Sequence, residues 1–228
     1  DALCYVDGTK LYINKNEVVG LVLTDSPKQL VSMGAYIIIM PDKVWCNTNS
    51  EDSKLECGYM ENKVELTEDT EIKFSICEAS GKVIEWHDAD YYKTNEPKDG
   101  SYMMSVNSNG KPSLKVYSAT TSIWMSVAST YVQISAEGIG KGFEKEDGIK
   151  ITTNNISESL DNIFVNDEGE GLYSTNTYIV DKTDNSITIP GIYSGKLTAF
   201  EGMTLKLERK VPDMSYITEC NNRLWGCS

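Results

Sequence analysis

The residue types best suited to chemistry lie together in the segment Trp86-His87-Asp88-Ala89-Asp90. His87 is the only histidine of the chain, so a metal site with several histidine ligands cannot form. No Gly-x-Ser-x-Gly motif accompanies it, and a serine triad is therefore not expected. Asp88 and Asp90 have the spacing of the first calcium-loop ligands, but Tyr92 occupies the next ligand position and the glycine of such a loop is missing. We expect no metal site and no catalytic residue here, and a His87 that is exposed or held by one hydrogen bond.

A second candidate is the glycine cluster Gly138-Ile139-Gly140-Lys141-Gly142. A phosphate-binding loop needs Gly-Lys-Ser/Thr at the start of a helix, whereas Phe143 and a charged turn follow here. The glycines therefore indicate turns or a bulge, and we expect no cofactor. Paired carboxylates of a glycosidase cannot be singled out among 34 acidic residues, so the sequence does not exclude that activity.

Aromatic side chains give the remaining binding candidates. Trp86, Tyr91, Tyr92 and Trp124 are possible interaction or stacking residues, since aromatic rings stack on sugars and anchor protein contacts. The tryptophans also lie in strand-like patterns, where an aromatic side chain usually packs in the core. The sequence leaves both alternatives open.

The charge balance narrows the classes of partner. The 228 residues contain 34 Asp and Glu against 21 Lys and Arg, which gives a formal net charge of −13. A surface this acidic repels phosphates and anionic headgroups, so neither nucleic acid nor a membrane surface is an expected partner. The longest apolar run is Ala35 to Met40, far short of the roughly 20 residues that a membrane helix needs, so no membrane insertion is expected.

The elements that must position these residues are predicted to be strands. Alternating polarity dominates, and almost every joint carries Gly, Asn, Asp or Pro, as in the Asp7-Gly8 turn between two short apolar runs. The pattern predicts an all-β chain of several antiparallel modules, with hairpin or propeller-like strand repeats and inserted small β-sandwich or barrel modules. Val18 to Leu23 is among the predicted strands, and the polar stretch from Asn47 to Glu71 is predicted to be a loop and domain junction.

Six cysteines could form three disulfides, but each lies in or beside an apolar run and no zinc-binding spacing occurs. We expect buried free thiols in a protein assembled in a reducing cytoplasm.

Three parts of the sequence resemble a known family. The first runs from Pro97-Lys98-Asp99-Gly100-Ser101-Tyr102 through Leu114-Lys115-Val116-Tyr117 to Ile123-Trp124-Met125-Ser126-Val127, and resembles a β-hairpin module of bacteriophage tail and fibre proteins. Ser101 and Ser105 stand where that module usually has Asp, and Ser122 where it has Gly.

The other two parts are Asp7 to Lys43, and Glu208 to Met214 with Glu219 to Gly226. They are similar to large tail structural proteins of phages and prophages of Gram-positive bacteria. The motif within the last part consists of Asn222, Arg223, Leu224, Trp225 and Gly226. In those relatives this stretch leads into further propeller-like β segments, and none of the shared motifs carries catalytic residues.

The resemblance implies a layout of three parts. Residues 1–70 and 205–228 would form a strand-repeat body, 71–135 an inserted β module with the hairpin motif, and 136–204 a second inserted module. The chain would then be a fragment of a larger protein.

The function implied is that of a virion structural protein, a tail or tail-tip component and not an enzyme. It would be assembled in the host cytoplasm, contact other tail proteins, form a homo-oligomer in the particle and present loops towards a host-surface glycan. The alternatives from the residues are a carbohydrate-binding or adhesin-type β module and, third, a glycosidase fragment.

Overall fold

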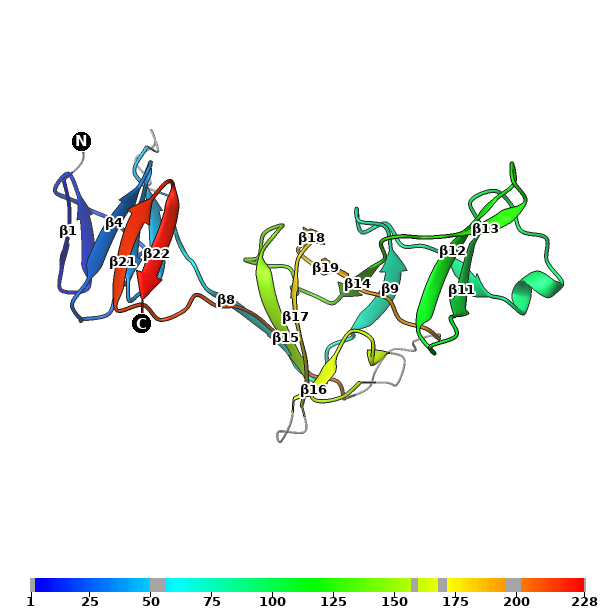
Figure 1. Cartoon of the computed structure of the whole chain (residues 1–228). Coiled ribbons are helices and arrows are strands. Elements are labelled where there is room, and N and C mark those ends of the chain that lie inside the picture. The colour runs from blue at the N-terminus through cyan, green and yellow to red at the C-terminus, as the bar shows by residue number, and fades with distance from the viewer. Residues whose placement is uncertain (1–2, 50–55, 157–159, 168–171, 196–201, 228) are drawn as a thin grey trace. The chain divides into compact units, whose positions relative to one another are not determined.

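The structure is a computed structural model that describes residues 3–49, 56–156, 160–167, 172–195 and 202–227. Almost all of the described regular structure is β, and η1 (Tyr91–Lys93) is a short 3-10 turn (Figure 1). The described strands form six sheets, and none of these sheets closes into a barrel. Neighbouring strands pair antiparallel, with a single parallel exception described below. The all-β, multi-module fold class predicted from the sequence is confirmed.

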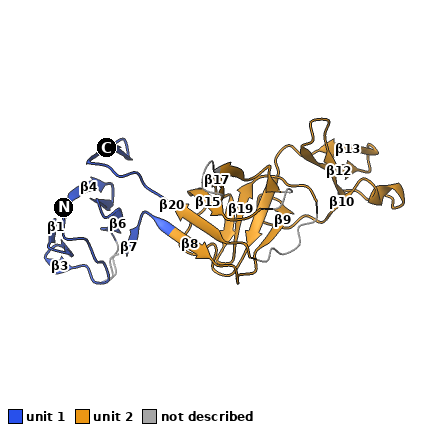
Figure 2. Ribbon diagram, turned by 90° about the horizontal axis from the view of Figure 1, so that it is seen from below, with its two compact units in different colours: residues 1–62, 210–228 blue, residues 63–209 orange. Residues whose placement is uncertain are grey.

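The chain divides into two compact units (Figure 2). Unit 1 comprises residues 1–62 and 210–228, and unit 2 comprises residues 63–209. Unit 2 is therefore a continuous insertion between two segments of unit 1.

Unit 1 consists of small antiparallel meanders. Its first sheet contains β1 (Cys4–Asp7), β2 (Lys10–Ile13) and β3 (Asn16–Glu17). Its second contains β4 (Gln29–Met33), β5 (Tyr36–Met40), β6 (Val44–Asn47) and β7 (Glu56–Tyr59), paired in chain order. The hairpin of β21 (Tyr216–Cys220) and β22 (Arg223–Cys227) lies beside β4 (Figure 1). The apolar core between the first two sheets is small: Leu11, Ile13, Val18, Leu21, Leu23, Ile37, Ile39, Val44 and Cys46.

Polar contacts attach the C-terminal segment to the rest of unit 1. The Gln29 side chain donates to the Ser215 carbonyl and accepts the Ile217 N–H at 3.0 Å. Lys43 Nζ lies 2.8 Å from Glu61 Oε1 and 2.7 Å from Asp213 Oδ1. Lys43 therefore ties together residues that are 152 positions apart along the chain, Glu61 and Asp213.

A buried ion pair lies near the start of the β4–β7 sheet. Lys28 Nζ is 2.5 Å from Asp42 Oδ2, and each side chain is only 5% exposed. Lys28 also donates to Thr24 Oγ1 at 2.6 Å and Ser26 Oγ at 2.8 Å, while Asp42 Oδ1 accepts the Thr24 N–H at 2.6 Å. Burial disfavours the Asp42 carboxylate, but the hydrogen bonds from Lys28 and Thr24 outweigh that effect and hold its pKa below the usual value.

The expectation of free thiols is wrong for two cysteines. Cys46 on β6 and Cys57 on β7 are direct cross-strand partners and form a disulfide. Residues 56–59 lie in the polar stretch where the sequence predicts a loop, but they form the edge strand β7, and this pairing brings Cys57 opposite Cys46. Cys77, Cys220 and Cys227 remain thiols, but only Cys77 is buried as expected, while Cys220 and Cys227 are exposed on the C-terminal hairpin. Burial raises the pKa of Cys77 to about 11.

Unit 2 contains two larger sheets. One has the order β18 (Asp181–Thr183), β19 (Ser186–Pro190), β14 (Tyr131–Ser135), β9 (Lys73–Cys77). The other has the order β16 (Val165–Asp167), β17 (Leu172–Tyr178), β15 (Gly148–Thr153), β20 (Leu205–Arg209), β8 (Asn62–Leu66). Their shared core includes the fully buried Phe143, Ile151 and Leu160.

The bounds of these units differ from the three parts expected from the sequence. β14 pairs with β9 on one side and with β19 on the other, so a single sheet combines strands from 71–135 and from 136–204. A boundary at residue 135 would divide that sheet. Alternating polarity predicts individual strands but not which distant strands pair. The sequence therefore predicts a module boundary near residue 135, in the middle of what is one sheet.

The glycine cluster serves close packing of the backbone. A Cβ atom at Gly140 would lie 1.9 Å from the Thr183 carbonyl oxygen, so no other residue fits there without displacing the chain. The Gly140 N–H donates to the Asp184 carbonyl at 3.0 Å. These contacts agree with the turn predicted from the sequence.

Candidate functional site

The aromatic candidates gather on the third sheet of unit 2. It has the order β10 (Trp86–Asp88), β11 (Tyr102–Val106), β12 (Pro112–Ser118) and β13 (Ile123–Ser126). β11, β12 and β13 form an antiparallel meander, while β10 is a three-residue edge strand parallel to β11. β11 to β13 are the strands of the segment that resembles the phage hairpin module.

The strand register separates the candidates onto two faces of this sheet. Trp86 lies opposite Tyr102, and both pack against the unit 2 core. Side chains alternate along a strand, so His87 points to the other face, which also carries the paired residues Tyr117 and Trp124. The four residues expected to stack therefore do not share one platform: Trp86 is on one face, and Tyr92 contacts Trp124 on the other.

The second face carries a chain of ring contacts. The rings of His87 and Tyr91 stack with centroids 3.7 Å apart and planes at 8°. Tyr92 meets Tyr91 edge-on at 5.1 Å and Trp124 at 4.9 Å, and Trp124 meets Tyr117 at 5.2 Å. Tyr92 and Trp124 are only partly exposed, so they act mainly as a small local core.

Two hydrogen bonds fix the turn that carries these tyrosines. The Tyr91 N–H donates to Asp88 Oδ1 at 2.8 Å, and the Tyr92 hydroxyl donates to the Tyr102 carbonyl at 3.1 Å. Burial raises the pKa of the Tyr92 phenol, which keeps it a neutral donor. Tyr91, by contrast, is 41% exposed. Among the four candidate residues, only Tyr91 is exposed, and the other three are partly buried.

A groove of about 580 Å³ opens beside β10, on the edge of the sheet. We call it the Tyr91 groove. Its lining residues come from β10 and the following turn, from the end of β11, and from the loop after β19: Trp86, His87, Asp88, Ala89, Asp90, Tyr91, Met104, Ser105, Val106, Ser194 and Gly195.

The Tyr91 groove is acidic and offers hydroxyl groups. Its described lining residues include Asp88 and Asp90, and none of these described residues is Lys or Arg. Asp90 pairs with Lys93 at 2.6 Å, and this contact lowers the pKa of the exposed Asp90 carboxyl. The Ser105 hydroxyl donates to the Ser113 carbonyl at 3.2 Å, so its proton is directed away from His87. The arrangement suits recognition by stacking and hydrogen bonding.

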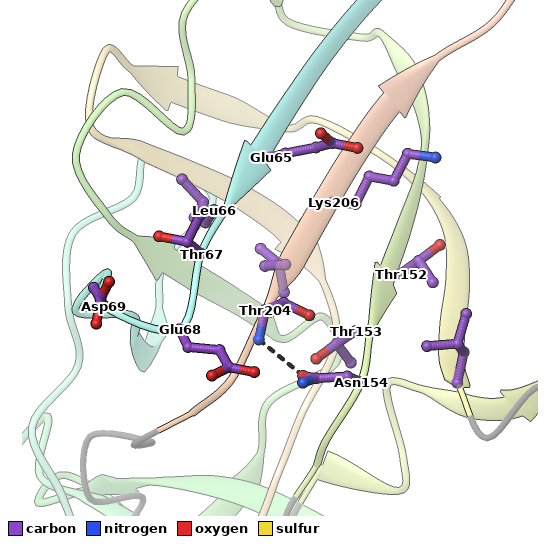
Figure 3. A pocket seen from close by; sticks show the side chains of 12 residues that line it. Glu65, Leu66, Thr67, Glu68, Asp69, Thr152, Thr153, Asn154, Thr204 and Lys206 are labelled. Atoms are coloured by element: carbon purple, nitrogen blue, oxygen red, sulfur yellow. Dashed lines mark hydrogen bonds between the residues drawn. The ribbon is translucent and has the colours of Figure 1, made fainter.

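A second cavity of about 590 Å³ lies in unit 2 at the ends of β8, β15 and β20 (Figure 3). Its wall carries Thr152, Thr153 and Asn154, with Lys206 and the acids Glu65, Glu68 and Asp69 also lining it. Asn154 Oδ1 accepts the Thr204 N–H at 2.8 Å, so this amide fastens two chain segments together. None of the 12 described residues that line it is a histidine, cysteine or serine.

The Asn222 to Gly226 motif forms the β21–β22 turn and most of β22. Asn222 occupies the turn with φ of 57°, and its N–H donates to Glu219 Oε1 at 2.7 Å. A Cβ at Gly226 would lie 2.0 Å from Met214 Sδ, which explains the glycine. Trp225 is 56% exposed, and its Nε1 donates to the Cys220 carbonyl at 3.3 Å. The motif is a structural hairpin with an exposed aromatic ring.

Metal-binding groups and membrane-spanning helices are two further features of functional interest. Among the residues that the structure describes, no group of three or more His, Cys, Asp or Glu side chains is arranged to hold a metal ion. Within the same residues, no helix is long and apolar enough to cross a membrane. Comparisons with protein-family models, with curated proteins and with solved structures gave no match.

Sequence reasoning identified Tyr91 and Trp86 but missed the other walls of the groove. Ser105 and Ser194 are separated by 89 positions, and the sequence offers no reason to expect either of them in a binding site. In the sequence, the only indication of a site here is the proximity of His87 to Asp88, Asp90, Tyr91 and Tyr92.

Proposed function

We propose that this chain is a structural component of a bacteriophage or prophage tail that acts through protein–protein contacts. In this proposal, unit 1 is part of a strand-repeat body and unit 2 is an inserted module that presents contact surfaces. The protein is not an enzyme in this proposal, and its place of action is the virion.

The proposal rests mainly on one observation: unit 1 is built from two separate chain segments, with all of unit 2 inserted between them. β4 to β7 form a four-stranded antiparallel meander, which is the sheet type of one propeller blade. β21 and β22, from the far end of the sequence, join that unit beside β4. A body of repeated meanders with a whole unit inserted into it is the organisation implied by the resemblance of Asp7 to Lys43 and Glu208 to Gly226 to tail proteins.

Exposed aromatic residues on unit 1 support a role in protein contacts. Tyr216 on β21 is 72% exposed and Trp225 on β22 is 56% exposed. The register pairs Thr218 with Trp225, which places Tyr216, Thr218 and Trp225 on one face of the hairpin. Aromatic side chains of this kind anchor protein interfaces. In the proposal, this face contacts a neighbouring tail subunit, and the net charge of −13 favours basic partner surfaces.

Labelling of intact particles tests this proposal. Antibodies raised against the purified chain are applied to particles released from the bacterium that encodes it, and bound gold is located by electron microscopy. We expect label on the tails, abolished by preincubation of the antibody with the chain. Particles that lack the chain by mass spectrometry, or label confined to unassembled material, would contradict the proposal.

A further inference from the structure

We infer that the Tyr91 groove binds a neutral, hexose-type carbohydrate. This inference goes beyond the tail assignment and does not depend on it, because such a site would serve an adhesin equally well.

Tyr91 provides the stacking surface. One face of its ring is covered by His87 in a parallel stack at 3.7 Å, and Tyr92 supports its edge, yet the residue is 41% exposed. The ring is therefore held in place before any ligand arrives, which lowers the entropy lost on binding. The flat C–H face of a pyranose packs against an aromatic face of this kind through dispersion and weak C–H contacts.

The polar groups around the ring suit the hydroxyls of a sugar. The Asp88 carboxylate accepts the Tyr91 N–H with Oδ1, but a carboxylate has about four acceptor sites and Asp88 is exposed. Ser105 donates its proton to the Ser113 carbonyl, so its oxygen is left as an acceptor towards the groove. Ser194 adds a further hydroxyl to the lining. Acceptors beside one aromatic face match the hydroxyl pattern of a polyol.

The charge of the groove selects against other small ligands. The Asp88 carboxylate lines the groove, and its negative charge disfavours sugar phosphates and acidic sugars. A quaternary ammonium ion prefers several aromatic faces directed at one point. Here one face of Tyr91 is already covered by His87, and the Asp90 charge is paired with Lys93. A neutral ligand satisfies these conditions best.

An added peptide strand is the main macromolecular alternative. β10 ends at Asp88, which lies opposite Met104, so the edge of β11 is uncovered at Ser105 and Val106. Two residues of open edge give a peptide few backbone hydrogen bonds compared with a full β-strand addition. The short edge therefore favours the carbohydrate.

A glycan array tests the inference with the full purified chain. The array carries neutral hexose oligosaccharides, sialylated and phosphorylated glycans, and extended peptides of mixed sequence. We expect binding to one or more neutral oligosaccharides, and the strongest of these is then used in calorimetry. Binding to acidic glycans alone, to peptides alone, or to nothing on the array would overturn the inference.

Variants locate the binding. Tyr91→Ala should weaken the affinity about tenfold, since it removes the stacking surface, whereas Tyr91→Phe should stay within about twofold. Tyr178→Ala is the matched control, because Tyr178 is 51% exposed on β17 and does not line the groove. Val106→Trp fills the groove from an exposed position without removing any fold contact of Tyr91, and should abolish binding in a folded chain. Unchanged affinity in both Tyr91→Ala and Val106→Trp would overturn the assignment.

The outcome is separable from that of the tail proposal. Particle labelling reports where the chain is found, and the array reports what this groove binds. A failed array leaves tail labelling intact, and unlabelled tails leave a positive array intact.

Discussion

Units 1 and 2 are both built from antiparallel strands but are stabilised by different means. The main core cluster of unit 2 contains 23 buried residues of the described chain, all of them hydrophobic, whereas that of unit 1 contains nine. Unit 1 adds a buried Lys28–Asp42 ion pair and the Cys46–Cys57 disulfide. A small meander cannot bury enough apolar surface by itself, so specific polar and covalent links contribute a larger share of its stability.

The contrast predicts that the two units respond to different perturbations. Hydrogen exchange measured by mass spectrometry reports them separately, since peptides from 63–209 belong to unit 2 and the others to unit 1.

The largest effect is expected from a cavity in unit 2. Phe143 is fully buried, and Phe143→Ala should lower the free energy of unfolding of unit 2 by about 4 kcal/mol, through lost burial and the cavity left behind. Val165→Ala is the control, because Val165 is 65% exposed. Exchange in unit 1 peptides should stay unchanged in both variants. Equal destabilisation of both units would show that they unfold together.

The next effect is expected in unit 1 from Asp42→Asn. This change leaves the Lys28 ammonium buried without its counter-charge and should cost about 3 kcal/mol, seen as faster exchange in unit 1 only. Glu17→Gln is the control, since Glu17 pairs with Lys10 at 2.9 Å on the surface, where such a pair contributes at most about 1 kcal/mol. A similar cost for both changes would indicate that the Lys28–Asp42 pair is solvated.

Reduction of the disulfide should have a somewhat smaller effect. Cys46 and Cys57 close a short loop with a sequence separation of 11, so reduction should destabilise unit 1 by about 2 kcal/mol through the greater freedom of the unfolded chain. Thermal unfolding with and without a reducing agent measures this change. The Cys46→Ser, Cys57→Ser double variant should be insensitive to the reductant, and an equal response from it would assign the effect to other thiols.

The smallest effect is expected from mild acid. The folded pKa of Asp42 is lowered, so its carboxylate contributes stability above the unfolded value of about 3.9, and this contribution is lost as pH falls through the lower folded pKa. Unit 1 should therefore lose stability below about pH 4, and Asp42→Asn should flatten this dependence. Denaturant titrations at a series of pH values measure it. Identical pH profiles for the variant and the parent chain would exclude Asp42 as the titrating group.

Much of the strand pattern was predictable because turns and alternation are local. A turn joins β1 and β2 as predicted, one residue later than expected: Asp7 ends β1 and pairs with Lys10, so Gly8 and Thr9 form the turn. The run from Ala35 to Met40 contains β5. The strand expected at Val18 to Leu23 is wrong: beyond β3 the segment is an irregular loop. Val18, Leu21 and Leu23 are buried there while Val19 and Val22 are exposed, so its apolar residues fill the core without strand pairing.

The candidate site was predictable only in part, because which side chains share a face depends on how the strands pair. Local sequence marked Tyr91 as aromatic and near acids, but its exposure depends on the stack with His87 and on the η1 turn. Trp86 and Trp124 carried the same sequence signal as Tyr91, and only the register of β10 to β13 shows that they lie on opposite faces. Pairing register is a property of the folded sheet, so residue spacing alone could not separate them.

Because unit 2 is one continuous segment of the chain, recombination can replace its coding sequence as a single piece. The chain crosses between the units at two places, next to β8 and β20, which are neighbours in one sheet. The pairings among β1 to β7 and between β21 and β22 stay within unit 1. A recombination event that exchanges the coding segment for 63–209 would replace the groove-bearing unit and leave those pairings in place. Selection can therefore diversify unit 2 while unit 1 keeps its sequence.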